Sequence, residues 1–189
     1  MFENRVADSM KLDFTDKSNK MQSVTVITTG GTIDKSYDEF EGTLSNRETL
    51  IKDLILSKLR LPYTFLEVFS IFSKDSLHMT DYDRVLLMKT IKAQQEKGQP
   101  IVVLHGTDTM SRSAEIVDNE IDNLRVAVVF TGAMKPMGFD DSDARQNVTE
   151  ALLASKLLEP GVYISFHNQV FKLPRVRKNK SKGTFEYSP

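Results

Sequence analysis

Residues 102–110 read VVLHGTDTM, an apolar β-branched run that stops at a glycine. Thr107, Asp108 and Thr109 follow that glycine, and a helix is predicted to begin near Ser111. This pattern is typical of a buried strand that ends in a polar turn. Because ligands in open α/β sheets bind outside the carboxyl ends of the strands, these hydroxyls and this carboxylate are placed to meet a small polar molecule.

Residues 24–33, VTVITTGGTI, show the same pattern earlier in the chain. Gly30 and Gly31 permit positive φ angles and therefore a tight turn directly after the strand. Two strand ends thus present threonines. We expect both to face one pocket.

Strands and helices alternate along the rest of the chain. Hydrophobic periodicity and end signals predict strands over 24–28, 65–71, 101–104, 125–130 and 161–166, and helices over 47–58, 81–98, 111–119 and 144–157. Thr80 and Asp83 have the spacing of a capping box for the second helix. The expected fold is α/β, a single domain with an open, mainly parallel sheet and helices on both faces, of the Rossmann or flavodoxin-like type.

Length and composition restrict the classes of protein to consider. With 189 residues the chain fits one domain, expected over 23–189 after a flexible extension over 1–22. A formal net charge of −1 gives no indication of nucleic-acid binding. The absence of cysteine excludes disulfides and thiolate chemistry and fits a reducing compartment. No run approaches the roughly 18 apolar residues of a membrane span, and the N-terminus lacks the apolar core of a signal peptide, so a cytoplasmic protein without membrane contact is expected.

Other polar clusters favour structural interpretations. The three histidines lack metal-ligand spacing, so no metal and no cofactor are expected. The acidic run around Asp140 and Asp143 is interpreted as a helix start rather than a cation site. Val170 and Phe171 suit a short hairpin, and the basic run over 172–182 is interpreted for most of its lysines as a solvated tail.

The two threonine motifs, TGGTI at 29–33 and HGTDTM at 105–110, together resemble the paired signatures of the bacterial-type L-asparaginases. VFTGAMKP at 129–136 resembles the family's segment after the second motif, and DSLHMT at 75–80 resembles its serine-bearing substrate loop. The resemblance runs from Val24 to the C-terminus. The family's second, smaller domain does not follow here, so the chain resembles a short, single-domain form.

The resemblance implies five catalytic residues. Thr32 would be the primary nucleophile, and Tyr37 its activating hydroxyl and part of a lid. Thr107 and Asp108 would work with a lysine, aligned with Lys178 although Lys172, Lys180 and Lys182 lie nearby. A lysine amine between a carboxylate and a hydroxyl can move a proton. The order in which the two threonines attack stays open.

A zwitterionic amino acid also needs its α-groups held. Asp108 would bind the α-ammonium, while Ser76 and the backbone near Gly31 and Gly106 would bind the α-carboxylate. Leu77 and His78 depart from the polar residues expected after that serine.

Each of these residues has a structural alternative. Thr32 by itself would be a turn residue, and Tyr37 an ordinary loop tyrosine. Asp108 would cap the following helix, and Lys178 would belong to the tail. His105 is expected to be a packed residue at a strand end without a catalytic role.

The resulting hypothesis is a cofactor-free amidohydrolase that converts L-asparagine and water to L-aspartate and ammonia. By resemblance it would be a homodimer or homotetramer. Glutamine would be a slower substrate, because one methylene gives only about 1–3 kcal/mol of discrimination. The alternatives are an amidase acting on another amide, including a subunit of a tRNA-amidation system, and a non-catalytic module that binds asparagine or a related amino acid.

Overall fold

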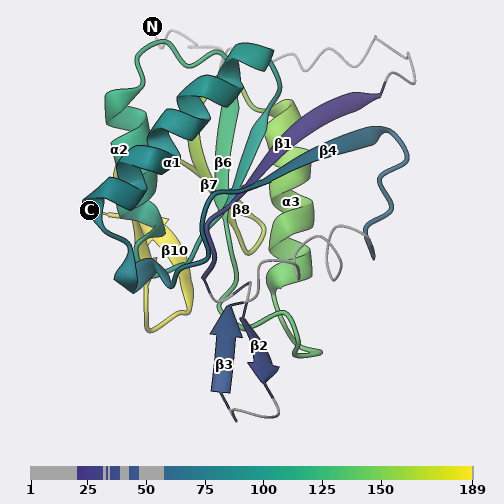
Figure 1. Ribbon diagram of the computed structural model, residues 1–189, viewed down its shortest axis with the longest axis vertical. Coiled ribbons are helices and arrows are strands. Elements are labelled where there is room, and N and C mark those ends of the chain that lie inside the picture. The colour runs from purple at the N-terminus through teal and green to yellow at the C-terminus, as the bar shows by residue number, and fades with distance from the viewer. Residues whose placement is uncertain (1–20, 32, 34, 39–42, 47–57, 189) are drawn as a thin grey trace, which may run out of the picture.

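The structure is a computed structural model that describes residues 21–31, 33, 35–38, 43–46 and 58–188 (Figure 1). The helix predicted over 47–58 lies outside this part of the chain except for Lys58. Residues 1–20 of the predicted extension lie outside it as well.

A six-stranded sheet forms the centre of the molecule, in the order β4-β1-β5-β6-β7-β8. The first five of these strands are parallel, and β8 pairs with β7 in the antiparallel sense. The strands are β1 (Gln22–Thr28), β4 (Thr64–Ser70), β5 (Ile101–Leu104), β6 (Ala127–Thr131), β7 (Gly161–Phe166) and β8 (Gln169–Lys172). The predicted strands and the mainly parallel sheet are therefore confirmed, with β1 beginning two residues earlier than expected.

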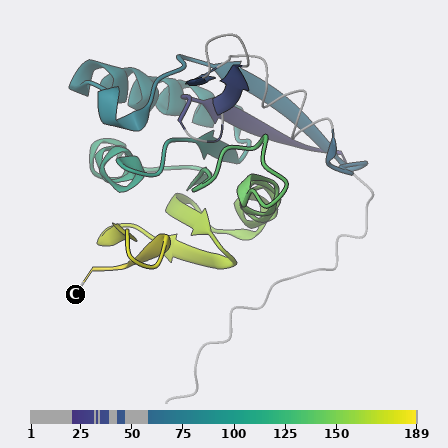
Figure 2. The same ribbon diagram turned by 90° about the horizontal axis from the view of Figure 1, so that it is seen from below.

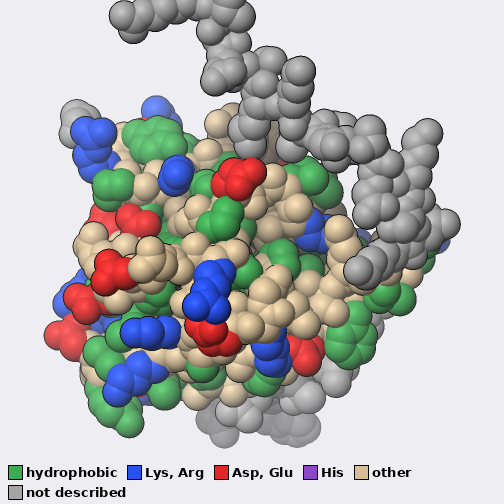
Figure 3. Space-filling model, turned by 90° about the horizontal axis from the view of Figure 1, so that it is seen from above, with side chains coloured by type: hydrophobic (Ala, Val, Ile, Leu, Met, Phe, Trp, Pro, Cys, Tyr) green, Lys and Arg blue, Asp and Glu red, His purple; other side chains and the backbone are tan. Residues whose placement is uncertain are grey.

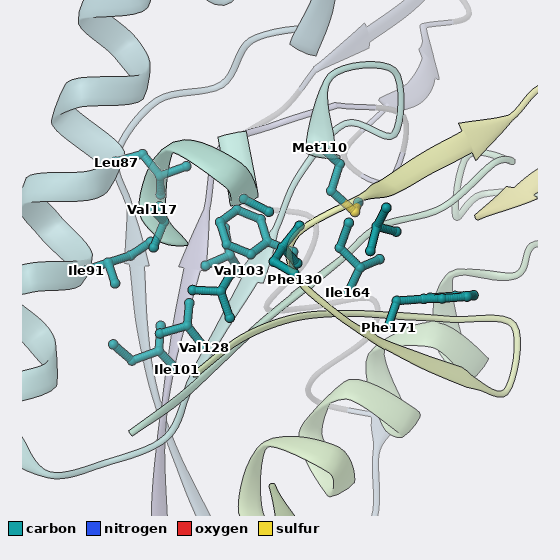
Figure 4. Packing of buried hydrophobic residues seen from close by; sticks show 14 of the residues in the cluster. Leu87, Ile91, Ile101, Val103, Met110, Val117, Val128, Phe130, Ile164 and Phe171 are labelled. Carbon is teal, nitrogen blue, oxygen red and sulfur yellow. The ribbon is translucent and has the colours of Figure 1, made fainter. Parts of the chain in front are cut away.

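Helices cover both faces of the sheet. Helices α1 (Asp81–Gln94) and α2 (Met110–Glu120) lie on one side and α3 (Ala144–Leu157) lies on the other (Figure 2). Alternate residues of β5 point to opposite faces of the sheet. Val103 packs in the cluster with α1 and α2, whereas Val102 and Leu104 pack in the cluster with α3. Figure 4 shows Val103, Val128 and Phe130 in the first of these clusters. Because both faces of the sheet are buried at its centre, β5 and β6 are buried along their whole length and almost continuously apolar, as expected for a parallel sheet.

The crossovers do not all have the same hand. Strands β5, β6 and β7 are parallel neighbours in one direction, yet α2 and α3, which connect them, lie on opposite faces. The two crossovers therefore have opposite hand, and one departs from the nearly universal right-handed rule.

The sequence signals at the ends of α1 correspond to real bonds. Thr80 and Asp83 make both hydrogen bonds of the predicted capping box. At the other end α1 continues as a 3-10 turn, η5 (Gln95–Lys97), which stops at Gly98 with a positive φ of 68°. This is the left-handed termination that glycine favours.

The basic run near the C-terminus is not a solvated tail. It forms a hairpin of β9 (Val176–Asn179) and β10 (Thr184–Tyr187), which corrects the sequence-based interpretation. Val176 and Phe185 are buried in the core on the α2 side, so two apolar residues fix a segment whose composition is mostly charged. A second hairpin joins β2 (Lys35–Asp38) and β3 (Thr43–Asn46).

The outer surface carries mixed charge. On the face in Figure 3, lysine and arginine side chains are interspersed with aspartate and glutamate. Within the described ranges, no helix has the length and apolar character needed to cross a bilayer.

The strand order places a switch point between β1 and β5. After β1 the chain forms β4 on one side of it and then returns to form β5 on the other. In chain order the five parallel strands read 2-1-3-4-5, the flavodoxin-like arrangement, in which ligands bind beyond the carboxyl ends of the strands at the switch point. Both threonine motifs follow these two strands.

Candidate active site

The two glycine-bearing turns at the switch point touch each other. A Cβ atom added to Gly31 would lie 2.5 Å from the Cα of Gly106, so only glycine lets the two backbones approach this closely. Gly30 and Gly31 have φ angles of 90° and 98°, which confirms the expected positive φ in this turn. The Gly30–Gly31 turn after β1 therefore lies directly against Gly106, in the turn after β5.

Ser76 lies on the other side of Gly106. A Cβ added to Gly106 would come within 2.6 Å of the Ser76 Cβ and 2.7 Å of its Oγ. Ser76 is buried and begins the 3-10 turn η4 (Ser76–His78), which Asp75 caps by accepting a hydrogen bond from the Leu77 N–H. Three residues predicted to hold the α-carboxylate, Gly31, Gly106 and Ser76, are thus neighbours in space.

Lys178 meets the second motif from the C-terminal hairpin. Its Nζ donates hydrogen bonds to Thr107 Oγ1 at 2.7 Å and to Asp108 Oδ1 at 2.9 Å. Its side chain is 17% exposed and that of Asp108 is 34% exposed. The amine therefore lies between a hydroxyl and a carboxylate, as predicted for a proton-transfer group.

The hairpin register explains why Lys178 reaches this position. Lys178 is directly opposite Phe185 in the β9–β10 pair, so both side chains project from the same face. Phe185 is buried, and its ring packs edge-on against Phe166 with 5.0 Å between the centroids. Burial of this aromatic face holds the hairpin against the sheet. Lys178 is thereby directed toward the carboxyl end of β5.

Asp108 does not cap the helix that follows it. The N-cap residue of α2 is Thr109, and no side chain makes a capping hydrogen bond there. Asp108 is exposed and accepts a hydrogen bond from Lys178 instead. The structural alternative for this residue is therefore wrong.

His105 is a packed residue, as expected from the sequence. It is fully buried, its Nδ1 donates to the Gly106 carbonyl at 2.8 Å, and its Nε2 lies 2.9 Å from Ser113 Oγ. Because a carbonyl can only accept, the neutral ring must receive the Ser113 proton at Nε2. Burial lowers the pKa of His105 to about 4, so the ring is neutral at physiological pH.

Two residues that were not among the predicted catalytic or substrate-binding residues support the Ser76 loop. Thr109 Oγ1 donates to the Ser76 carbonyl at 2.9 Å and receives a hydrogen bond from Arg84 Nη2 at 3.2 Å. Arg84 is almost completely buried on α1. Thr109 is part of the HGTDTM motif, so its position was a usable signal, whereas nothing in the local pattern marked Arg84.

A second polar network lies at the start of α3. The Asp143 carboxylate accepts hydrogen bonds from the backbone N–H groups of Met134 and Lys135 and from the side chains of Asn147 and His167. Burial raises the pKa of Asp143, but these hydrogen bonds outweigh it and leave the pKa below its usual value. The network ties the loop after β6 to the β7–β8 turn. The acidic residue therefore has a structural role here, as the sequence favoured.

In the described part of the chain, no three histidine or acidic side chains are grouped so that they could hold a metal ion. Two predicted catalytic groups remain outside the description: Thr32 is not among the described residues, and of Tyr37 only the backbone in β2 is described. The structure therefore brings Gly31, Ser76, Gly106, Thr107, Asp108 and Lys178 to one sheet edge.

Comparison with known proteins gives consistent matches. A family model described as "Asparaginase, N-terminal" matches residues 23–187. The 60 kDa lysophospholipase of Homo sapiens is 37% identical over 134 residues, which are 70% of this chain and 23% of that protein. L-asparaginase of Thermococcus kodakarensis is 30% identical over 161 residues, which are 84% of this chain and 48% of that protein.

A solved structure agrees with the sequence matches. The thermostable L-asparaginase from Thermococcus kodakarensis superimposes with a TM-score of 0.80 and 27% sequence identity. The match covers 88% of this chain and 51% of the solved chain. The chain thus spans about half the length of the L-asparaginase that it matches.

Proposed function

The chain belongs to the asparaginase family, and from this premise we propose that it hydrolyses L-asparagine to L-aspartate and ammonia. The observation that supports this most directly is the contact of Lys178 with both Thr107 and Asp108. An amine, a hydroxyl and a carboxylate meet at the end of β5, beside Gly106, which the Gly30–Gly31 turn touches. Amide hydrolysis requires a nucleophile, a proton carrier and groups that hold the substrate, and residues of these types converge there.

Substrate binding would use the strand ends. In this proposal the Asp108 carboxylate pairs with the α-ammonium of asparagine, and Ser76 with the backbone near Gly31 and Gly106 binds the α-carboxylate. The close contact of Gly31, Gly106 and Ser76 supports this, because a small amino acid would meet all three together. The side-chain amide would then extend toward the two threonines.

The first half of the proposed reaction is acyl transfer. The Thr32 hydroxyl oxygen forms a bond to the amide carbon while its proton passes to the Tyr37 oxygen and Tyr37 releases its own hydroxyl proton. The bond from carbon to nitrogen then breaks, and the nitrogen takes up that proton and leaves as ammonia. The product is an aspartyl ester on Thr32. Hydrogen bonds from backbone amides to the carbonyl oxygen would stabilise the tetrahedral species.

The second half is hydrolysis of that ester. Water attacks the ester carbon and gives a proton to Thr107, whose own proton moves to Lys178 as the Lys178 ammonium gives up one of its protons. The bond between carbon and the Thr32 oxygen breaks, and the proton returns to that oxygen. Asp108 stabilises the ammonium form of Lys178 while it holds the proton. Water is consumed, aspartate is released, and the threonine is restored.

Ammonia release from L-asparagine tests the proposal. Wild-type protein is expected to release ammonia, and Thr32→Ala is expected to lose most of the activity, since the nucleophile is gone. Thr149→Ala is the matched control, because Thr149 lies exposed on α3 and bonds only the Arg145 carbonyl in its own helix. Equal rates in wild type and Thr32→Ala would show that Thr32 is not the nucleophile.

The same assay separates the alternatives. An amidase for another substrate would release ammonia faster from glutamine or a different amide than from asparagine. A binding module would be stabilised against heat by asparagine in a saturable way and release no ammonia. Either result would replace the asparaginase proposal.

We further propose a cytoplasmic homodimer or homotetramer, on the basis of the family resemblance. Light scattering coupled to size-exclusion chromatography measures the mass in solution directly. A mass equal to one chain at micromolar concentration would contradict this part of the proposal.

A further inference from the structure

Arg84 is a buried arginine whose hydrogen-bond partners among the described residues are all uncharged. Its side chain is 3% exposed. Nη1 donates to the carbonyls of Met79 at 2.7 Å and Thr80 at 3.1 Å, and Nη2 donates to Thr109 Oγ1 at 3.2 Å. Asp81 Oδ1 lies 3.9 Å from Nη1, but that carboxylate is 81% exposed and bonds Arg112 at 2.8 Å.

Stability gives a poor explanation of this arrangement. A charge that is removed from water without a close counter-ion is costly, and an apolar side chain of similar volume is often equally or more stabilising. Within the described residues, the Nε–H of Arg84 is also buried and has no acceptor. Burial and the nearby Arg112 both lower the pKa of the guanidinium. The fold retains an unfavourable group at this position.

The guanidinium joins two segments that are far apart in the chain. Met79 and Thr80 end the loop that begins at Ser76, and Thr109 belongs to the turn that carries Thr107 and Asp108. The Thr109 hydroxyl has one proton, and it is donated to the Ser76 carbonyl at 2.9 Å. Its oxygen accepts from Arg84, so both roles of the hydroxyl are used. Arg84 thereby holds the Thr109 side chain in one rotamer. The hydrogen bond from Thr109 in turn holds the Ser76 backbone in place against Gly106.

We propose that Arg84 and Thr109 are positioning residues that set how tightly the Ser76 loop recognises the α-carboxylate of the substrate. This inference rests on the proposed function, because it assigns the support of a site defined there. Neither residue would touch the reacting amide. Their loss should therefore weaken binding of the carboxylate and leave the chemical step nearly unchanged.

Two substrates that differ only at that carboxylate provide the test. L-asparagine carries it, whereas 3-aminopropanamide has the same amide and amine without it. Thr109→Val removes the hydroxyl and keeps the shape. We expect it to raise KM for asparagine roughly tenfold, with kcat within about threefold, as the loss of one hydrogen bond to the loop predicts. For 3-aminopropanamide, kcat/KM should stay within about twofold of wild type.

Further variants separate positioning from general damage. Thr109→Ser keeps the hydroxyl and should restore the wild-type KM. Arg84→Lys keeps the charge but cannot hold Met79, Thr80 and Thr109 with one planar group, so it should resemble Thr109→Val. Thr90→Val is the matched control on α1, where the Thr90 hydroxyl bonds only the Leu86 carbonyl. If Thr109→Val does not fold, Arg84→Lys provides the same comparison.

An equal loss on both substrates, or no loss on asparagine, would overturn the inference. Binding measurements distinguish failure of this inference from failure of the proposed function. If wild type releases no ammonia, calorimetric titration with L-aspartate and with β-alanine replaces the two substrates. A tenfold weaker affinity of Thr109→Val for aspartate alone would then support the positioning role without catalysis. Failure of wild type to bind either compound would overturn both proposals.

Discussion

Lys178 donates a 2.7 Å hydrogen bond to Thr107, although 71 positions separate the two residues in the chain. The bond joins the C-terminal hairpin to the end of β5. Because Asp108 shares the same amine at 2.9 Å, the hairpin contributes a cation that bonds two neighbouring residues of this motif. The contact is partly exposed, so it adds little to stability. The proposed function gives it a role in proton transfer.

Replacing Lys178 by methionine should therefore reduce catalysis far more than stability. We expect Lys178→Met to lower kcat for asparagine by about 100-fold or more, because a positioned proton-transfer group typically contributes 10²–10⁴-fold. The melting temperature should change little. Lys180→Met, an exposed lysine on the same hairpin, is the matched control and should keep wild-type rates. Equal activity of Lys178→Met and Lys180→Met would remove Lys178 from the mechanism.

Gly106→Ala tests the packing between the turn and the serine loop. The added Cβ would lie 2.6 Å from the Ser76 Cβ, so the loop must move. Overpacking of this kind costs about 1–3 kcal/mol, and here it displaces Ser76, to which the proposed function assigns substrate binding. We expect at least a tenfold loss of kcat/KM for asparagine. Gly98→Ala is the control, because Gly98 has a positive φ but open space around it, so its loss should affect stability without affecting activity.

The sequence was sufficient to predict most of the sheet, because β5, β6 and β7 are short, mostly apolar runs that end at glycine or polar residues. The N-terminal cap of α1 was equally predictable, since Thr80 and Asp83 interact within one turn. The basic hairpin could not be predicted from the sequence, because only two of its residues, Val176 and Phe185, are buried apolar residues. The residues they pack against lie elsewhere in the chain. Local composition therefore favoured a tail.

The candidate site was likewise predictable from the sequence only in part. The pattern at two strand ends predicted that the two threonine motifs would face one pocket, and the sheet topology explains why their glycine turns touch. Lys178 was selected among neighbouring lysines only by resemblance, whereas its register opposite Phe185 selects it physically. Arg84 could not be found from the sequence, because its acceptors are carbonyls and a hydroxyl whose positions exist only in the folded chain.

The buried His105 should make stability depend on pH. Its pKa falls from 6.5 in the unfolded chain to about 4 in the fold. Between these values the unfolded chain binds the extra proton, so the free energy of unfolding should rise with pH through this window and reach its full value above it. This difference in pKa corresponds to roughly 3 kcal/mol in the free energy of unfolding. Urea unfolding at pH 4.5 and pH 7 measures it.

His105→Gln should lose that component of the pH dependence, because no imidazole remains to be protonated. His78→Gln is the control on the surface: it leaves the buried ring in place and should retain the wild-type dependence on pH. An unchanged slope for His105→Gln would contradict the buried neutral imidazole.

Asp83 should give a second, more acidic transition. Its carboxylate accepts hydrogen bonds from Lys74 Nζ at 2.7 Å and from the Thr80 N–H at 2.7 Å, and these outweigh burial and lower its pKa from 3.8 to about 2. A carboxyl with a depressed pKa stabilises the fold above its unfolded value and loses that contribution as pH falls toward 2. Asp83→Asn should therefore flatten the stability curve between about pH 4 and pH 2. It should also cost about 1–2 kcal/mol at pH 7 through the weakened helix cap. Asp81→Asn is the control, because Asp81 lies in the same turn but is 81% exposed. It should neither flatten the stability curve nor lower stability at pH 7. Equal acid sensitivity of the two variants would argue against the Lys74 contact.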